Sequence, residues 1–156
     1  MVQRTYQGLG SPETAVREFE VLKPYVVQLL GLQGECLKLG PDYMAIGIAL
    51  DGLQTAAYHF TRRRYFYHGI EASRAEHRDG NGRLTDRQEA IAAFRALTPY
   101  ADRLRALQGR CRPFARDYLA LDIARQSLET TAYHFTQEPD FYGLKGDGAG
   151  PTRRTF

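Results

Sequence analysis

The 156-residue chain contains no tryptophan and only two cysteines, Cys36 and Cys111. Two thiols cannot form the several disulfides of a small secreted scaffold, and no C-x-x-C pair is present to begin a structural zinc site. A chain of this length buries about 70% of the surface that its unfolded form exposes, so its core needs neither kind of cross-link. We expect both cysteines to be reduced, buried thiols.

Long apolar runs are also absent. The longest nearly apolar stretch, residues 43–50, is far shorter than the roughly 20 residues that a helix needs to cross a bilayer. Residues 1–10 lack the apolar region of about 7 to 15 residues that a secretory signal contains. We therefore expect a cytoplasmic protein with no membrane partner.

Neither sign of charge dominates the sequence. The chain has 21 lysines and arginines against 18 aspartates and glutamates, interspersed in both halves, with a net charge of +3. Because a dedicated nucleic-acid surface needs a sustained basic excess, we do not expect nucleic acid as a partner. The nucleophile motif G-x-S-x-G, the P-loop and the dinucleotide-binding fingerprint are all missing. The sequence therefore favours a non-enzymatic protein.

What the chain does contain is an internal repeat. A shift of 75 residues aligns positions 15–67 with positions 90–142 without a gap and gives 24 identities over 53 positions. The block Tyr58–Thr61 recurs unchanged as Tyr133–Thr136. Two copies of this length are too few and too long for a solenoid, so the pattern predicts a tandem duplication that forms a fused pseudo-dimer.

Each copy is expected to form three helices, and the fold class is all-α. Ser11 with Pro12, and Thr85 with Gln88, provide start signals for the first helix of each copy. The prolines at positions 24 and 99 interrupt the helical pattern. The third helices are predicted at about 42–61 and 117–136, and the second helices are expected to end near Gly40 and Pro113.

The predicted architecture is a pseudo-twofold helical bundle. Residues 1–75 form the first three-helix repeat, residues 76–142 form the second repeat packed on it as one globular domain, and residues 143–156 form a flexible tail.

Each third helix carries two distinct sectors. The first is a stripe of small and apolar residues that we expect to pack within the three-helix unit; its members are Ala45, Ala49, Leu53, Ala56, Ala57 and Phe60, with Ala120, Ala124, Leu128, Ala132 and Phe135 in the second copy. The second sector, about a quarter turn away, is identical in the two copies; it contains Ile48, Thr55, Tyr58 and His59, and Ile123, Thr130, Tyr133 and His134.

Three interpretations of the second sector remain open. It can be the contact between the two repeats across a pseudo-twofold axis. It can instead be a ligand site built from Tyr58, His59, Tyr133, His134, Thr55 and Thr130, in which the imidazoles bind haem or a metal ion. A catalytic zinc site needs three protein ligands and a di-iron carboxylate bundle needs Glu-x-x-His pairs. The chain has four histidines in all and no Glu-x-x-His pair, which counts against both kinds of site. Finally, each histidine can simply be favoured by the dipole at a helix C-terminus.

The segments that follow the third helices differ in charge between the copies. Arg62, Arg63 and Arg64 correspond to residues 137–139, which begin an acidic segment that contains Glu138 and Asp140. The opposite signs suggest that the basic segment docks on the acidic one, within the chain or between chains. Contact with phosphate or a nucleic-acid strand is an alternative for the arginines.

Two short segments resemble known motifs. Residues 77–88 resemble an EF-hand calcium loop, although His77 and Gln88 stand at the positions of its first and last carboxylates; the matching residues are Asp79, Asn81, Gly82 and Leu84. Arg63 and His68 have the R-x-x-x-x-H spacing of helical HEPN ribonucleases, a resemblance that implies a nuclease.

The sequence thus favours a non-enzymatic helical binding or interaction module. Its partner is an unknown protein or small molecule, and homo-oligomerisation is one form that this interaction can take. A haem or metal protein that uses the repeated Tyr-His pairs is the first alternative, and a helical nuclease is the second.

Overall fold

The computed structural model describes residues 6–70 and 83–143, and every regular element in these ranges is helical. The elements in chain order are α1 (Pro12–Glu20), α2 (Lys23–Gly34), α3 (Pro41–Thr61), the 3₁₀ helix η1 (Arg83–Thr85), α4 (Arg87–Arg95), α5 (Thr98–Gln108) and α6 (Arg116–Thr136). The all-α prediction is confirmed. No described helix is both long enough and apolar enough to traverse a bilayer.

The first helices begin at polar caps, but only one of the two predicted caps is correct. The Ser11 hydroxyl accepts a hydrogen bond from the Thr14 backbone N–H at 3.2 Å, and Pro12 occupies the first helical position. In the second half, Asp86 caps α4 and accepts a bond from the Gln88 N–H at 3.0 Å. The capping box predicted at Thr85 is wrong, because Thr85 is the last residue of η1 and the N-cap position of α4 is one residue later, at Asp86.

Proline separates the two short helices in each half. Pro24 and Pro99 each lie in the first turn of the second short helix, where their missing N–H removes no intrahelical bond. The second helices are shorter than predicted and end at Gly34 and Gln108. In each half a turn then leads to the long helix, and Leu39 and Phe114 adopt positive φ angles of 65° and 64° in these turns.

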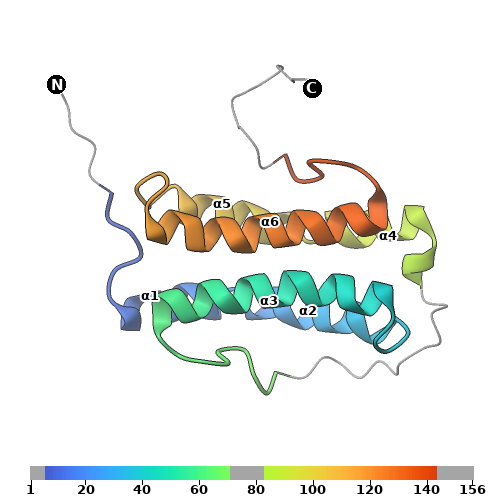
Figure 1. Cartoon of the computed structure of the whole chain (residues 1–156), viewed down its shortest axis with the longest axis horizontal. Helices are drawn as coiled ribbons and strands as arrows, with labels where there is room; N and C mark the ends of the chain where they lie inside the picture. Colours follow the sequence, from blue (N-terminus) through green and yellow to red (C-terminus); the bar gives the residue numbers. More distant parts are fainter. Residues whose placement is uncertain (1–5, 71–82, 144–156) are drawn as a thin grey trace.

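The helices form two layers. In Figure 1, α3 and α6 lie side by side and antiparallel in front, α1 and α2 lie behind α3, and α4 and α5 lie behind α6. The two long helices approach closely at Gly52, where a Cβ atom would overlap the Ser127 side chain. Small residues on both helices permit this approach between the two halves, whereas the small residues of the first stripe were expected to pack within each three-helix unit.

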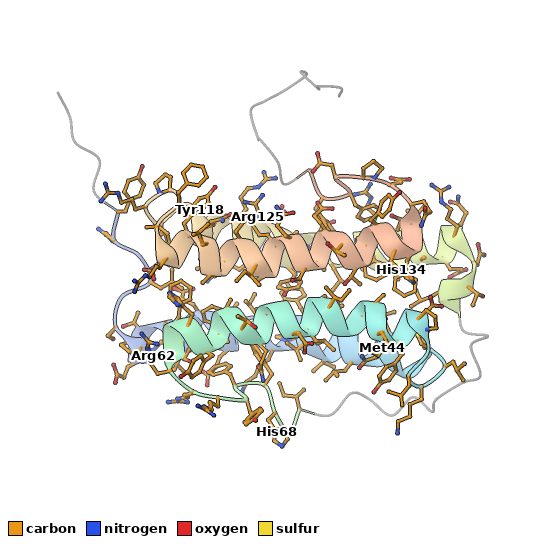
Figure 2. All side chains as sticks on the ribbon, in the orientation of Figure 1. Met44, Arg62, His68, Tyr118, Arg125 and His134 are labelled. Atoms are coloured by element: carbon orange, nitrogen blue, oxygen red, sulfur yellow. The ribbon has the colours of Figure 1, made fainter. Side chains whose placement is uncertain are left out.

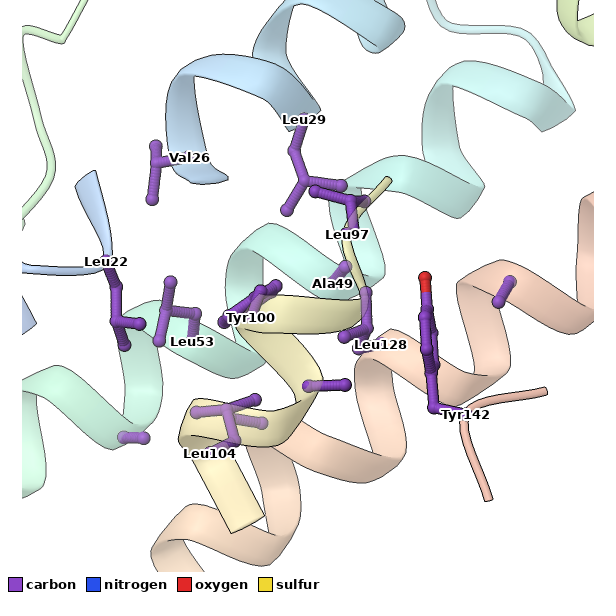
Figure 3. Close-up of a cluster of buried hydrophobic side chains, with 14 of the residues drawn as sticks. Leu22, Val26, Leu29, Ala49, Leu53, Leu97, Tyr100, Leu104, Leu128 and Tyr142 are labelled. Carbon is purple, nitrogen blue, oxygen red and sulfur yellow. The ribbon is translucent and has the colours of Figure 1, made fainter. Parts of the chain in front are cut away.

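The core lies between the layers. All the residues of the predicted first stripe are buried, so this part of the core prediction is confirmed. Phe19 stacks on Phe60 with ring centroids 5.7 Å apart, and Phe94 stacks on Phe135 at 5.4 Å. Figure 3 shows part of this cluster, including Leu22, Leu29, Leu53, Leu97, Tyr100, Leu104 and Leu128.

Both cysteines are buried free thiols, as expected. Their Sγ atoms donate to the carbonyl oxygens of Leu32 and Leu107. Burial raises the pKa of Cys36 and of Cys111 to about 11. Neither thiol is therefore a ready nucleophile at neutral pH.

The predicted boundary at residues 75–76 lies outside the described residues. The same holds for positions 77–82 of the calcium-loop resemblance, and for all of the predicted tail except Gly143.

Candidate functional site

The two repeated histidines each bind an aspartate of the other half. His59 Nε2 lies 2.8 Å from Asp117 Oδ1, and His134 Nε2 lies 2.8 Å from Asp42 Oδ1. A carboxylate accepts, so Nε2 donates in each pair. The aspartates occupy the first turns of the long helices, where the helix dipole favours a carboxylate, and the histidines occupy the last turns. Each pair therefore joins the end of one long helix to the start of the other.

These contacts keep the two imidazoles far apart. His134 lies 17 positions after Asp117 along α6, which corresponds to about 25 Å at 1.5 Å per residue. Figure 2 shows His134 at the same end of the helix pair as Met44, with Arg62 at the opposite end. One haem iron or metal ion cannot reach both rings, so the predicted single site is not assembled. Among the described residues, no group of three or more His, Cys, Asp or Glu side chains is placed to hold a metal.

The predicted tyrosines and threonines do not converge on a cavity either. The side chains of Thr55, Thr130, Tyr58 and Tyr133 are all exposed. His59 borders an open pocket of about 320 Å³ with Arg62, Arg116 and residues 7–10, but the other predicted ligand residues do not line it. The second sector therefore divides: its histidines contact the opposite half, and its other members face solvent.

The exposed members belong to a continuous surface, which we call the outer face. It is the side of α3 and α6 that points away from the two short-helix pairs, toward the viewer in Figure 1. It consists of Met44, Ile48, Asp51, Thr55 and Tyr58 on α3, and Leu119, Ile123, Gln126, Thr130 and Tyr133 on α6, all of them exposed. Six of these ten side chains are large and apolar or aromatic, and each of the six is between 41% and 57% exposed.

The outer face carries almost no charge. α3 contains no lysine or arginine. In α6 the basic residues are Arg116, at the first position, and Arg125, which is only 7% exposed and donates to Gln108 Oε1. Asp51 is therefore the one charged member of the outer face. A charge-depleted centre with aromatic and aliphatic side chains is typical of a protein interface.

The spacing of the outer face is also regular. Its members on α3 follow one another at intervals of four, three, four and three residues, and those on α6 repeat the same intervals. The mean interval of 3.5 residues is the spacing at which one helix packs lengthwise against another.

The arginine segment does not dock on the acidic segment of the same chain. Glu138 instead lies near two arginines of its own half, with its carboxylate oxygens 3.7 Å from Arg87 and 3.9 Å from Arg95. Because α3 and α6 are antiparallel, the residues after α3 lie at the opposite end of the pair from the residues after α6. The predicted docking within the chain is therefore wrong. Arg64 lies over the Tyr58 ring, 6.0 Å from its centroid.

The two residues that resemble a nuclease motif lie in the loop after α3, and both are exposed. His68 lines a pocket of about 160 Å³ whose other lining residues include Val26, Leu30 and Tyr67. Arg63 does not line this pocket. Arg63 and His68 therefore do not line a common pocket among the described residues.

A further set of ion pairs joins the halves on the other side of the molecule. Glu18 of α1 accepts from Arg103 at 2.6 Å and from Arg110 at 3.1 Å. Burial raises the pKa of Glu18, but the two arginines outweigh burial and leave that pKa below its ordinary value. The carboxylate is therefore charged at neutral pH and holds the first half to the second.

Comparison of the chain with protein-family models, curated proteins and solved structures gave no match.

Sequence reasoning missed two kinds of residue at this site. Asp42 and Asp117 recur in both copies, but their interpretation as helix-start residues did not point to a partner on the other half. Met44 and Leu119 differ between the copies and were therefore not grouped with Ile48. The sequence signal for Met44 and Leu119 is their position: each lies four residues before an exposed isoleucine, on the same face of its helix.

Proposed function

We propose that the protein is a non-enzymatic helical interaction module and that the outer face is its binding surface. The observation that carries this proposal is the identity of exposed residues in the two halves. Ile48 and Ile123 are 44% and 45% exposed, and Tyr58 and Tyr133 are 41% and 47% exposed. Each pair is identical, as are the exposed threonines between them.

Packing in the core explains why buried residues are identical in the two halves, but it does not explain why the exposed isoleucines, threonines and tyrosines are identical. Other equivalent exposed residues have diverged: Glu20 corresponds to Arg95, and Lys38 corresponds to Pro113. On the outer face itself, Met44 and Asp51 correspond to Leu119 and Gln126, so it is the isoleucine, threonine and tyrosine pairs that need an explanation. Leaving an isoleucine and a tyrosine exposed gains nothing from the hydrophobic effect unless another molecule covers them. A binding surface used by both halves supplies that reason.

We infer further that the halves descend from one three-helix unit and pack around a pseudo-twofold axis. Residues near such an axis contact their own equivalents. Gly52 faces Ser127, 75 positions later, and Tyr25 stacks on Tyr100 with centroids 5.4 Å apart. Away from the axis, the His59–Asp117 and His134–Asp42 pairs are equivalent contacts at the two ends of the long helices, as twofold symmetry requires.

The test is capture of partners by immobilised protein from an extract of cells that naturally express the chain. The outer-face variant carries Ile48→Asp and Ile123→Asp, and the control carries Val21→Asp, because Val21 is 50% exposed at the end of α1. We expect one or a few proteins, whether another chain or this one, to be retained by the wild type and the control but not by the outer-face variant. Equal capture by all three folded proteins would contradict the proposal.

A further inference from the structure

We propose that the occupant of the outer face is a second copy of this chain, so that α3 and α6 of two copies form a homodimer interface of four long helices. This inference rests on the proposed function, because it names the partner of the same surface. Four properties of the outer face carry it: its spacing, its extent, its charge and its internal repetition.

The spacing specifies a helical occupant. Intervals of four and three residues keep Met44, Ile48, Thr55 and Tyr58 on one line along α3. A partner that fits such a line over the whole helix must itself present a long helix that runs beside it. The chain's own α3 and α6, each of 21 residues, meet this requirement.

The extent is sufficient for a specific dimer. Each long helix is about 31 Å in length and about 10 Å across, so two adjacent helices present about 600 Å². Two such faces together bury about 1,200 Å², which is the lower end of the range for specific protein–protein interfaces. A smaller apolar patch would not support a dimer by itself.

The charge permits self-association. Two copies of a surface rich in lysine or arginine would repel each other, but none of the ten outer-face residues is a lysine or arginine, although the chain contains 21 such residues, and Arg64 reaches the face only at the Tyr58 ring. Among the ten members of the face, the one like charge that two copies bring together is Asp51. Hydroxyl groups of Thr55, Thr130, Tyr58 and Tyr133 lie on the same face and can donate to a carboxylate of the other copy.

The internal repetition suits a twofold dimer. In a twofold dimer the same surface is used by both partners, so each contact occurs twice. On the outer face, Ile48 and Tyr58 of α3 already have identical counterparts on the antiparallel α6. A second copy therefore meets an exposed isoleucine, threonine and tyrosine on each of the two long helices.

The decisive experiment is sedimentation velocity and light scattering on purified full-length protein at concentrations up to about 100 µM, well above the micromolar dissociation constant expected for a weak interface of this kind. We expect a species of twice 17.7 kDa. The Ile48→Asp/Ile123→Asp variant should sediment as a folded monomer, whereas Val21→Asp should remain dimeric. A wild type that is monomeric throughout, or a dimer that the outer-face variant leaves intact, overturns the proposal.

A cross-link locates the interface independently of stability. Cys36 and Cys111 are buried, so Thr55→Cys provides one exposed thiol, and Gln28→Cys on α2 is the matched control. A bis-maleimide should join two copies of the Thr55→Cys protein and leave the control unjoined; joining only the control would contradict the inference. If the wild type is monomeric but captures another protein through the outer face, this inference fails and the proposed function stands. If neither association occurs, both fail.

Discussion

Single hydroxyl groups hold the returning loops in both halves of the molecule. After each long helix the chain folds back, and a buried tyrosine fixes it: the Tyr67 hydroxyl donates to Phe19 O at 2.6 Å, and the Tyr142 hydroxyl donates to Phe94 O at 2.7 Å. Burial raises the pKa of both hydroxyls, so they remain neutral donors. Tyr100 is different, because its buried hydroxyl has no hydrogen-bond partner among the described residues.

The same chemical change should therefore have opposite consequences at two buried tyrosines. Tyr142→Phe removes a buried hydrogen bond and should lower the free energy of unfolding by about 1 kcal/mol. Tyr100→Phe removes an unpartnered hydroxyl and should leave the free energy unchanged or raise it. Urea denaturation measures both, with the exposed Tyr65→Phe as a control. A larger loss for Tyr100→Phe than for Tyr142→Phe would show that this account of the two hydroxyls is wrong.

Among the helices, the pair α3 and α6 sets the geometry of both layers. Local signals were enough to predict these two helices to within one residue, because a first-turn aspartate and an apolar stripe lie within the sequence of each. The ends of α2 and α5 were placed too late, because turns through Leu39 and Phe114 left no equally clear local signal. The His59–Asp117 pair could not be predicted, since a face pattern fixes an angle around one helix but not its register against another.

The close approach of the long helices leads to a compensation test. Gly52→Ala places a methyl group into the Ser127 side chain and should lower the free energy of unfolding by about 1–3 kcal/mol. Adding Ser127→Gly should restore most of this loss, because the methyl group then has room. Thermal denaturation of the two variants and of Ser127→Gly alone measures the effect. No recovery in the double variant would contradict direct crowding at this position.

For the whole molecule, the halves are held together by more than apolar packing. Glu18 belongs to the first half, and Arg103 and Arg110 belong to the second. The pKa of Glu18 is lowered in the folded protein, so this contribution is complete well above the ordinary value of 4.5 and is lost as the pH falls through the lowered pKa.

Acid should therefore reveal this connection. Glu18→Gln should lower the free energy of unfolding at pH 7 by about 1 kcal/mol, because both arginines lose a charged acceptor. The difference from the wild type should shrink as the pH falls below 4.5, where the wild-type carboxyl becomes protonated. Glu20→Gln, an exposed position on the same helix, is the control. A difference that is constant from pH 7 to pH 3 would rule out the ion pairs as its cause.

The buried guanidinium of Arg125 has a consequence for how the molecule can change. Its counterpart on the other long helix is Leu50, so this position carries a charged side chain in α6 and an apolar side chain in α3. In a dimer of two separate identical chains, the same substitution would occur in both copies. If the halves descend from one unit, as we propose, a single polypeptide accepts the change once, and each half can diverge here while Ile48, Thr55 and Tyr58 keep identical counterparts on the outer face.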